Sequence, residues 1–313
     1  MSAAFPRPDR AHLLCFPPVS RRVPAALKSF CASGAFRERA LSRALALALS
    51  FTLAASVAAQ AALSTPSAPS CSTHSPAHRV ALVELYSSEG CNDCPPADDW
   101  LGQWKQGGTQ QGVVPLALHV DYWDGLGWTD RFAQHRFTER QRTLSALAGG
   151  SVVYTPEVFV GGHELRRWSD PSSFAARVRQ IDAETSPADI TLTLAPRAAG
   201  ELAVDASFVT RERSQRDWQA YVAVYENALV SQVAAGENRG ATLHHERVVR
   251  QWLGPVPVVD GRATIGQTVR VPVDATASNA AAPDDRPRYG VAAFVERATT
   301  GDVLQAADLP ACR

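Results

Sequence analysis

The sequence predicts an α/β domain with a mixed sheet, followed by an antiparallel β-rich domain. Up to residue 185, short apolar runs alternate with stretches of helical spacing, which is the pattern of a sheet with crossover helices. From residue 186 onward, short and mostly alternating segments are separated by Gly, Pro, Asn and Asp, which is typical of a β-sandwich or barrel. A chain of 313 residues is long enough for two such domains.

The first domain is expected at residues 79–185, with its elements in the order strand–helix–strand–helix–strand–strand–helix. The expected elements are strands at 80–86, 113–120, 157–160 and 163–167, and helices at 95–106, 131–148 and from 171 onward. Asp170 is a suitable N-cap for the last helix, and Pro171 suits its first position. The first half predicts a right-handed parallel crossover, and the Gly161-Gly162 turn predicts a hairpin edge.

The second domain is expected at residues 186–313 and consists of strands alone. Six are predicted, at 190–194, 202–209, 218–225, 243–252, 263–273 and 290–296. This segment shows no internal repeat and no second catalytic motif.

A leader with a secretory signal is expected at residues 1–61. Basic residues precede an uncharged stretch at 44–58, and a small-residue site, Ala59-Gln60-Ala61, follows it. The alternatives are a transmembrane anchor, although the run is shorter than the ~20 apolar residues that a spanning helix needs, and a lipoprotein anchor at Cys71. Residues 62–78 are rich in Ser, Thr, Pro and Ala and predict a linker. A periplasmic or secreted protein without a stable membrane anchor after cleavage is expected.

The charge balance excludes nucleic acid as a partner. The leader holds eight Lys/Arg and two Asp/Glu, so the remainder holds 23 basic and 29 acidic residues, a net charge of −6. Phosphate binding needs clustered Lys and Arg. Of the six cysteines, Cys15 and Cys31 fall in the leader. Four remain, an even number that suits an oxidising compartment, and we predict a disulfide between Cys71 and Cys312.

Cys91-Asn92-Asp93-Cys94 is the motif most suggestive of chemistry. Two residues between cysteines at a helix start allow the sulfurs to bond, and the helix N–H groups can stabilise a thiolate. In this strand–helix order, the motif predicts a thioredoxin-like domain with Cys91 outward and Cys94 inward. An inert local disulfide and half of a zinc site are the alternatives, although no second pair of ligands with suitable spacing appears.

Tyr154-Thr155-Pro156 precedes the expected strand at 157–160 and should face the dithiol. We predict a cis Thr155–Pro156 peptide there, which would present a backbone edge to an incoming peptide and make these two residues substrate-binding. An ordinary proline at a strand start is the alternative.

The end of the strand expected at 113–120 and the loop that follows it gather unusual side chains. They are His119, Asp121, Tyr122, Trp123 and Asp124. One interpretation places them along the dithiol pocket, with Asp121 or His119 moving protons. A buried polar network that braces the loop is equally compatible. A third interpretation joins Cys91, Cys94 and His119 as copper ligands.

Four long motifs together resemble those of the DUF1223 family, a group of exported bacterial proteins with a thioredoxin-like fold. They are S-S-E-G-C-x-x-C-P-P-A-D, H-V-D-Y-W-D-x-L-G-W-x-D, F-T-E-R-Q-R and V-Y-T-P-E-V-F-V-x-G, at residues 87–98, 119–130, 137–142 and 153–161. The resemblance implies the fold for residues 80–184 and says little about activity.

These observations predict an exported thiol–disulfide oxidoreductase that needs no cofactor and no metal. Cys91 and Cys94 would be catalytic, and the substrate would be a protein or a small thiol or disulfide. The negative charges of Glu89 and Asp93 oppose thiolate formation at Cys91, so a weakly oxidising or reducing pair is expected. The alternative is a non-enzymatic binding or copper-handling module with a structural Cys91–Cys94 disulfide.

Overall fold

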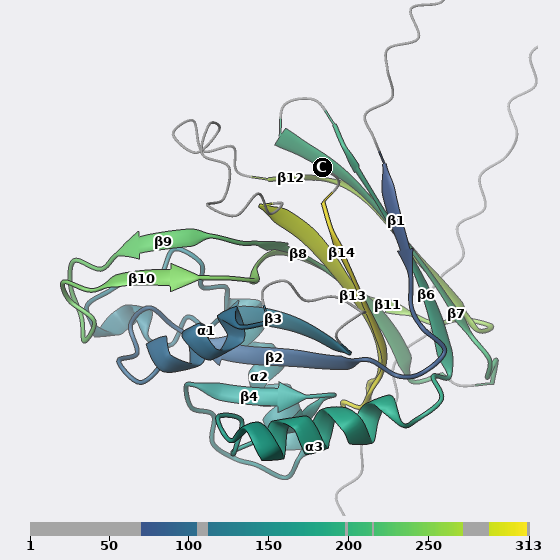
Figure 1. Cartoon of the computed structure of the whole chain (residues 1–313), viewed down its shortest axis with the longest axis horizontal. Helices are drawn as coiled ribbons and strands as arrows, with labels where there is room; N and C mark the ends of the chain where they lie inside the picture. The colour runs from purple at the N-terminus through teal and green to yellow at the C-terminus, as the bar shows by residue number, and fades with distance from the viewer. Residues whose placement is uncertain (1–69, 105–111, 198–199, 215, 272–287, 312–313) are drawn as a thin grey trace, which may run out of the picture. The chain divides into compact units, whose positions relative to one another are not determined.

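The computed structural model describes residues 70–104, 112–197, 200–214, 216–271 and 288–311, all within one compact unit (Figure 1). The expected leader at 1–61 and Cys312 lie outside the described residues. Within the described ranges, no helix is both long enough and apolar enough to cross a membrane.

Fourteen strands and three α-helices make up this part of the chain. The helices are α1 (Pro95–Gly102), α2 (His135–Leu147) and α3 (Pro171–Asp182). The strands are β1 (Cys71–His74), β2 (Ala81–Ser87), β3 (Val113–His119), β4 (Glu157–Val160), β5 (His163–Glu164), β6 (Ala188–Pro196), β7 (Glu201–Thr210), β8 (Trp218–Glu226), β9 (Leu229–Gln232), β10 (Thr242–His245), β11 (Val248–Pro257), β12 (Arg262–Arg270), β13 (Tyr289–Arg297) and β14 (Val303–Pro310).

The predicted fold class, a thioredoxin-like α/β domain followed by a β-rich domain, is wrong. The described chain is mostly β, and strands from both expected domains share one eight-stranded sheet in the order β14-β13-β8-β11-β3-β2-β4-β5. The physical reason is the edge of β3, whose open backbone groups need a partner. Strand β11 supplies that partner, running parallel to β3 with Val248 opposite Ala117.

Two smaller sheets complete the strand pairing. One has four strands in the order β1-β6-β7-β12, and the other is the two-stranded ribbon of β9 and β10. Strand β1 lies inside the segment predicted as a linker, where Cys71 is opposite Leu194 of β6. The Cys71 sulfur lies 3.7 Å from the carbonyl oxygen of Pro310, two positions before Cys312, and the Cys71–Cys312 pairing stays a prediction.

Three apolar clusters fix how the layers pack. The first lies between the four-stranded sheet and the β8, β13 and β14 part of the large sheet, and Phe208 and Val222 are fully buried in it. The second covers the large sheet with α2, through Phe137 and Leu144. The third packs α1 and α3 on β2 and β3. The large sheet is therefore buried on both faces, which explains why β2, β8 and β13 are apolar almost throughout.

The strand predicted at 243–252 is divided by a turn. Arg247 lies between β10 and β11 with a left-handed φ of 60°, and its guanidinium turns inward. It donates to both carboxylate oxygens of Asp308 at 2.7 and 3.0 Å and lies over the ring of Tyr225. This buried bidentate pair joins the start of β11 to β14.

Candidate functional site

Cys91 and Cys94 form a disulfide in the turn between β2 and α1, with their Cα atoms 5.5 Å apart. Cys94 is the N-cap of α1, and the backbone N–H groups of Ala97 and Asp98 donate to its carbonyl oxygen. Pro95 occupies the first turn and has no N–H to offer. Both cysteines are buried, at 1% and 0% exposure, so the expected outward position of Cys91 is not observed in this disulfide form.

The segment at Thr155 forms one wall of the disulfide site. The predicted cis Thr155–Pro156 peptide is confirmed, and the Cys91 sulfur lies 3.8 Å from the Thr155 carbonyl oxygen. Trp123 supports this wall, because its indole N–H donates to the Thr155 hydroxyl at 2.8 Å. Gly90 allows Trp123 to lie close to the turn, since a Cβ at position 90 would be 3.1 Å from the Trp123 Cβ.

The aromatic and acidic loop separates into different structural roles. Asp121 accepts from Thr138 at 2.5 Å and pairs with the exposed His135 at 2.8 Å, which fastens the loop to α2. Asp124 accepts from the backbone N–H of Asp130, and Tyr122 packs half-buried against the cluster around Phe137. These contacts match the bracing interpretation for Asp121, Tyr122 and Asp124.

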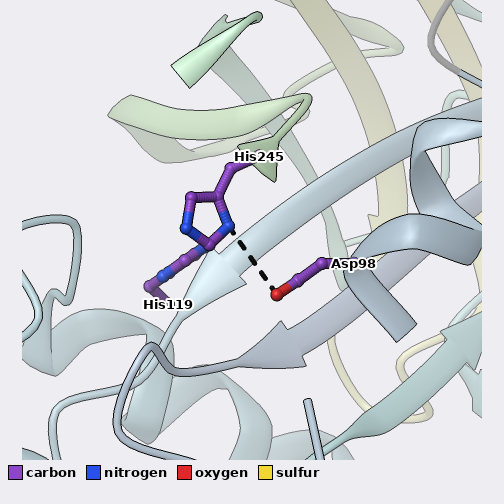
Figure 2. A group of neighbouring side chains, drawn as sticks. All are labelled: Asp98, His119 and His245. Atoms are coloured by element: carbon purple, nitrogen blue, oxygen red, sulfur yellow. Dashed lines mark ion pairs between the residues drawn. The ribbon is translucent and has the colours of Figure 1, made fainter. Parts of the chain in front are cut away.

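His119 enters a buried polar cluster, as one of the sequence interpretations allowed, together with His245, which the sequence analysis did not connect with it. Its Nδ1 lies 2.6 Å from Asp130 Oδ2 with both side chains fully buried. His245 of β10 lies nearby, with Nε2 3.3 Å from Glu89 Oε1 and Nδ1 3.7 Å from Asp98 Oδ2. Figure 2 shows the imidazoles of His119 and His245 beside the Asp98 carboxylate.

The acid side chains of this cluster have their own donors. The Trp128 indole N–H donates to Glu89 Oε2 at 2.8 Å. Ser87 donates to Asp98 Oδ2 at 3.2 Å. The backbone N–H of Glu89 donates to Asp130 Oδ2 at 2.9 Å. The carboxylates are therefore fixed in position by donors from the end of β2, the disulfide turn and the loop after β3.

Burial and charge act in opposite directions on the cluster's pKa values. Burial lowers the pKa of His119, but the adjacent Asp130 carboxylate outweighs it and raises that pKa to about 9. Burial raises the pKa of Asp130, yet His119 and two backbone N–H groups lower it to about 2. Burial would also raise the Glu89 pKa, and the nearby His245 and Trp128 hold it below its usual range. The Asp98 pKa is raised, chiefly by burial.

Residues 237–238 cover the disulfide turn from the β9–β10 ribbon. The Asn238 amide donates to the carbonyl oxygens of Glu89 and Cys91, each at 2.9 Å. The backbone N–H of Asn92 donates to the Glu237 carboxylate at 3.2 Å. In Figure 1 the ribbon of β9 and β10 extends beside α1. The cover is thus held to the turn by hydrogen bonds.

The sequence profile described as "Protein of unknown function (DUF1223)" matches residues 82–295. The chain belongs to the DUF1223 family. A comparison with curated proteins found no match.

Two solved structures resemble this DUF1223 protein in fold. An X-ray structure of a protein from Agrobacterium tumefaciens is 24% identical, with a TM-score of 0.50, covering 74% of this chain and 95% of the other. HBP35 of Porphyromonas gingivalis is 14% identical, with a TM-score of 0.55, covering 76% of each chain. These identities support a shared fold and carry no activity across.

The DUF1223 match spans the disulfide and the buried polar cluster alike. Sequence reasoning missed Asn238 and His245 because they lie in the segment assigned to a separate β domain. A signal was present: two adjacent histidines, His244 and His245, in an alternating strand put one of them on the inner face. The two sulfurs are bonded to each other in this structure, and the copper alternative that joins Cys91, Cys94 and His119 stays a prediction.

Proposed function

We propose that this DUF1223 protein carries out thiol–disulfide exchange at Cys91 and Cys94, with a protein or small-molecule thiol as its partner. The observation that supports this most is the cover over the turn. Neither sulfur belongs to the three apolar core clusters, and residues 237–238 contact the turn through hydrogen bonds. Such contacts can open without unfolding the core.

The exchange itself needs one attack and one resolution. A partner thiolate attacks one sulfur of the pair, the Cys91–Cys94 bond breaks, and a mixed disulfide forms while the other cysteine leaves as a thiolate. A second partner thiol then resolves the mixed disulfide. The pair gains two electrons and two protons, and the partner leaves as a disulfide. The reverse sequence oxidises a partner dithiol.

The start of α1 argues for a pair that is not a strong oxidant. A strong oxidant has a stabilised thiolate. Here Pro95 and Pro96 supply no N–H, and the N–H groups of Ala97 and Asp98 are already bonded to the Cys94 carbonyl oxygen. Few donors remain for a thiolate. We expect a potential near −270 mV or so, far from about −120 mV.

The test is reduction of the folded protein in glutathione buffers, followed by alkylation and peptide mapping. The pair should be reduced without loss of tryptophan fluorescence, and a Cys94→Ser variant should trap a mixed disulfide at Cys91. Asn238→Ala removes two hydrogen bonds worth about 0.5–1.5 kcal/mol each. The total of about 1–3 kcal/mol should speed reduction roughly fivefold to 150-fold. Arg239→Ala, an exposed neighbour in the same loop, is the matched control and should leave the rate unchanged.

A pair that resists reduction until the protein unfolds would show that the disulfide is structural, and the proposal would fail. Equal reduction rates for Asn238→Ala and Arg239→Ala would show that residues 237–238 are not the barrier.

A further inference from the structure

We propose that Asp98, His119 and His245 form a binding site for a divalent transition-metal ion of the zinc type. One ligand atom from each residue lies within 4.8 Å of the other two, and all three side chains are buried. The site is separate from the disulfide and does not depend on the proposed exchange reaction.

Unpartnered ring nitrogens are the observation that points to a ligand. Within the described residues, His119 Nε2 and both ring nitrogens of His245 have no hydrogen-bond partner. His245 Nε2 comes within 3.3 Å of Glu89 without the alignment of a hydrogen bond. Buried polar atoms without partners are rare and costly in folded proteins, and a metal ion would satisfy His119 Nε2 and His245 Nδ1.

The three donors converge on one point. Figure 2 shows His245 and Asp98 facing each other, with the His119 ring beside them. His245 Nδ1 is 3.7 Å from Asp98 Oδ2. Ligand atoms around a tetrahedral ion with bonds of about 2 Å stand about 3.3 Å apart. Shifts of roughly 1 Å would therefore close the site around His119 Nε2, His245 Nδ1 and Asp98 Oδ2.

Carboxylates behind the two histidines match the outer shell of a metal site. A metal-bound imidazole commonly gives its other N–H to a carboxylate, which fixes the ring. His119 Nδ1 has Asp130 at 2.6 Å, and His245 Nε2 has Glu89 at 3.3 Å. Asp130 is itself held by the N–H groups of Glu89 and Phe132. Asp130 thus orients the His119 ring, and Glu89 lies where a small shift would let it accept from His245 Nε2.

The donor set selects the class of ion. Two imidazole nitrogens with one carboxylate oxygen suit zinc and its neighbours in the first transition row. Calcium and magnesium prefer sites made of oxygen alone, and Cu(I) prefers thiolates, which the bonded cysteines do not offer. Three protein ligands leave one position for a water molecule or another small ligand.

The test uses the full chain with its disulfide oxidised and no reductant, so that cysteine thiolates cannot contribute. After chelation and dialysis, Zn²⁺ alone is titrated by calorimetry. We expect saturation at one ion per chain, and at least a tenfold loss of affinity in His245→Gln. His244→Gln is the matched control, because this neighbour on β10 is exposed, and it should bind like the unmodified chain.

Two further measurements keep the result decisive if His245→Gln does not fold. Asp130→Asn should weaken binding about 10–100-fold through the outer shell. Co²⁺ bound to the unmodified chain should give the intense visible absorption of a four-coordinate ion. Absence of saturable binding, or binding removed by His135→Gln at the exposed surface group of His135, Asp121 and Glu139, would overturn the proposal.

Discussion

Glu157 should make the stability of this protein fall as pH rises. Burial raises the pKa of Glu157 from 4.5 to about 7. The folded protein therefore keeps a proton on this carboxyl between about pH 4.5 and 7, where the unfolded chain has released it. Since the unfolded state binds fewer protons in that window, the free energy of unfolding decreases as pH rises through it, and the loss is complete above about pH 7.

The size of the effect follows from the shift and the surroundings. One pKa unit corresponds to about 1.4 kcal/mol. Glu157 is only 1% exposed, and because relaxation of the surroundings lowers the cost of a buried charge, we expect a total on the order of 1–2 kcal/mol. Glu157 accepts from the Gln141 amide at 2.6 Å, and the same amide donates to the Tyr154 carbonyl oxygen. Ionisation of Glu157 therefore affects, through Gln141, the segment that forms the wall beside Cys91.

Glu157→Gln keeps the shape of the side chain and removes its charge. We expect the variant and the unmodified protein to be equally stable near pH 4, and the variant to be more stable by about 1–2 kcal/mol at pH 8. The assay is urea unfolding followed by tryptophan fluorescence at each pH. Glu139→Gln, at an exposed position of helix α2, is the control and should show no such trend. A stability difference that does not change between pH 4 and 8 would refute the reasoning.

Two further substitutions test contacts between segments of the large sheet. Asp308→Ala leaves the buried Arg247 guanidinium without its bidentate partner and should lower the free energy of unfolding in urea by about 3–5 kcal/mol. The double variant with Arg247→Met should recover most of that loss. A double variant no more stable than Asp308→Ala would contradict this. Gly162→Ala places a Cβ 1.8 Å from the Gly301 carbonyl oxygen at a φ of +87°. Thermal unfolding should show a loss larger than about 1 kcal/mol, and an unchanged midpoint would count against the close approach.

Local structure was predictable from the sequence because local chemistry determines it. Strand β4 has the predicted bounds, Glu157–Val160. Asp170 caps α3 by accepting from the backbone N–H of Ser172. The turn at Gly161-Gly162 uses positive φ at both positions, as its two glycines suggest. Each of these features depends on residues that are close together in the chain.

The sheet as a whole was not predictable in the same way. Joining β11 to β3 brings Val248 beside Ala117, and no local pattern specifies a pairing across that separation. The alternation expected of an independent sandwich was also misleading, because β8 and β13 are covered on both faces. Their near-continuous apolar runs are the mark of central strands, which the prediction of a separate domain overlooked.

The candidate site likewise contains some features that local sequence predicts and others that depend on contacts between distant segments. The Cys91–Cys94 disulfide and its neighbour Thr155 were accessible from motif spacing and element order. His245 and Asn238 were not, since their relation to the disulfide turn exists only once β9 and β10 lie beside α1. The unusual residues at 119–124 did mark part of the site, but they have different roles. The fold alone shows that His119 belongs to the buried cluster and that Asp121 fastens the loop to α2.

The cover over the disulfide also imposes an order of events in time. Asn238 lies 147 positions after Cys91, whereas the two cysteines are three positions apart. A chain made from its N-terminus exposes the complete C-x-x-C turn while the residues that will enclose it have yet to be synthesised. During that interval any oxidant can reach both sulfurs freely. Once the ribbon docks, exchange at the pair requires the hydrogen bonds of Glu237 and Asn238 to open, so the two sulfurs are most accessible before the ribbon folds.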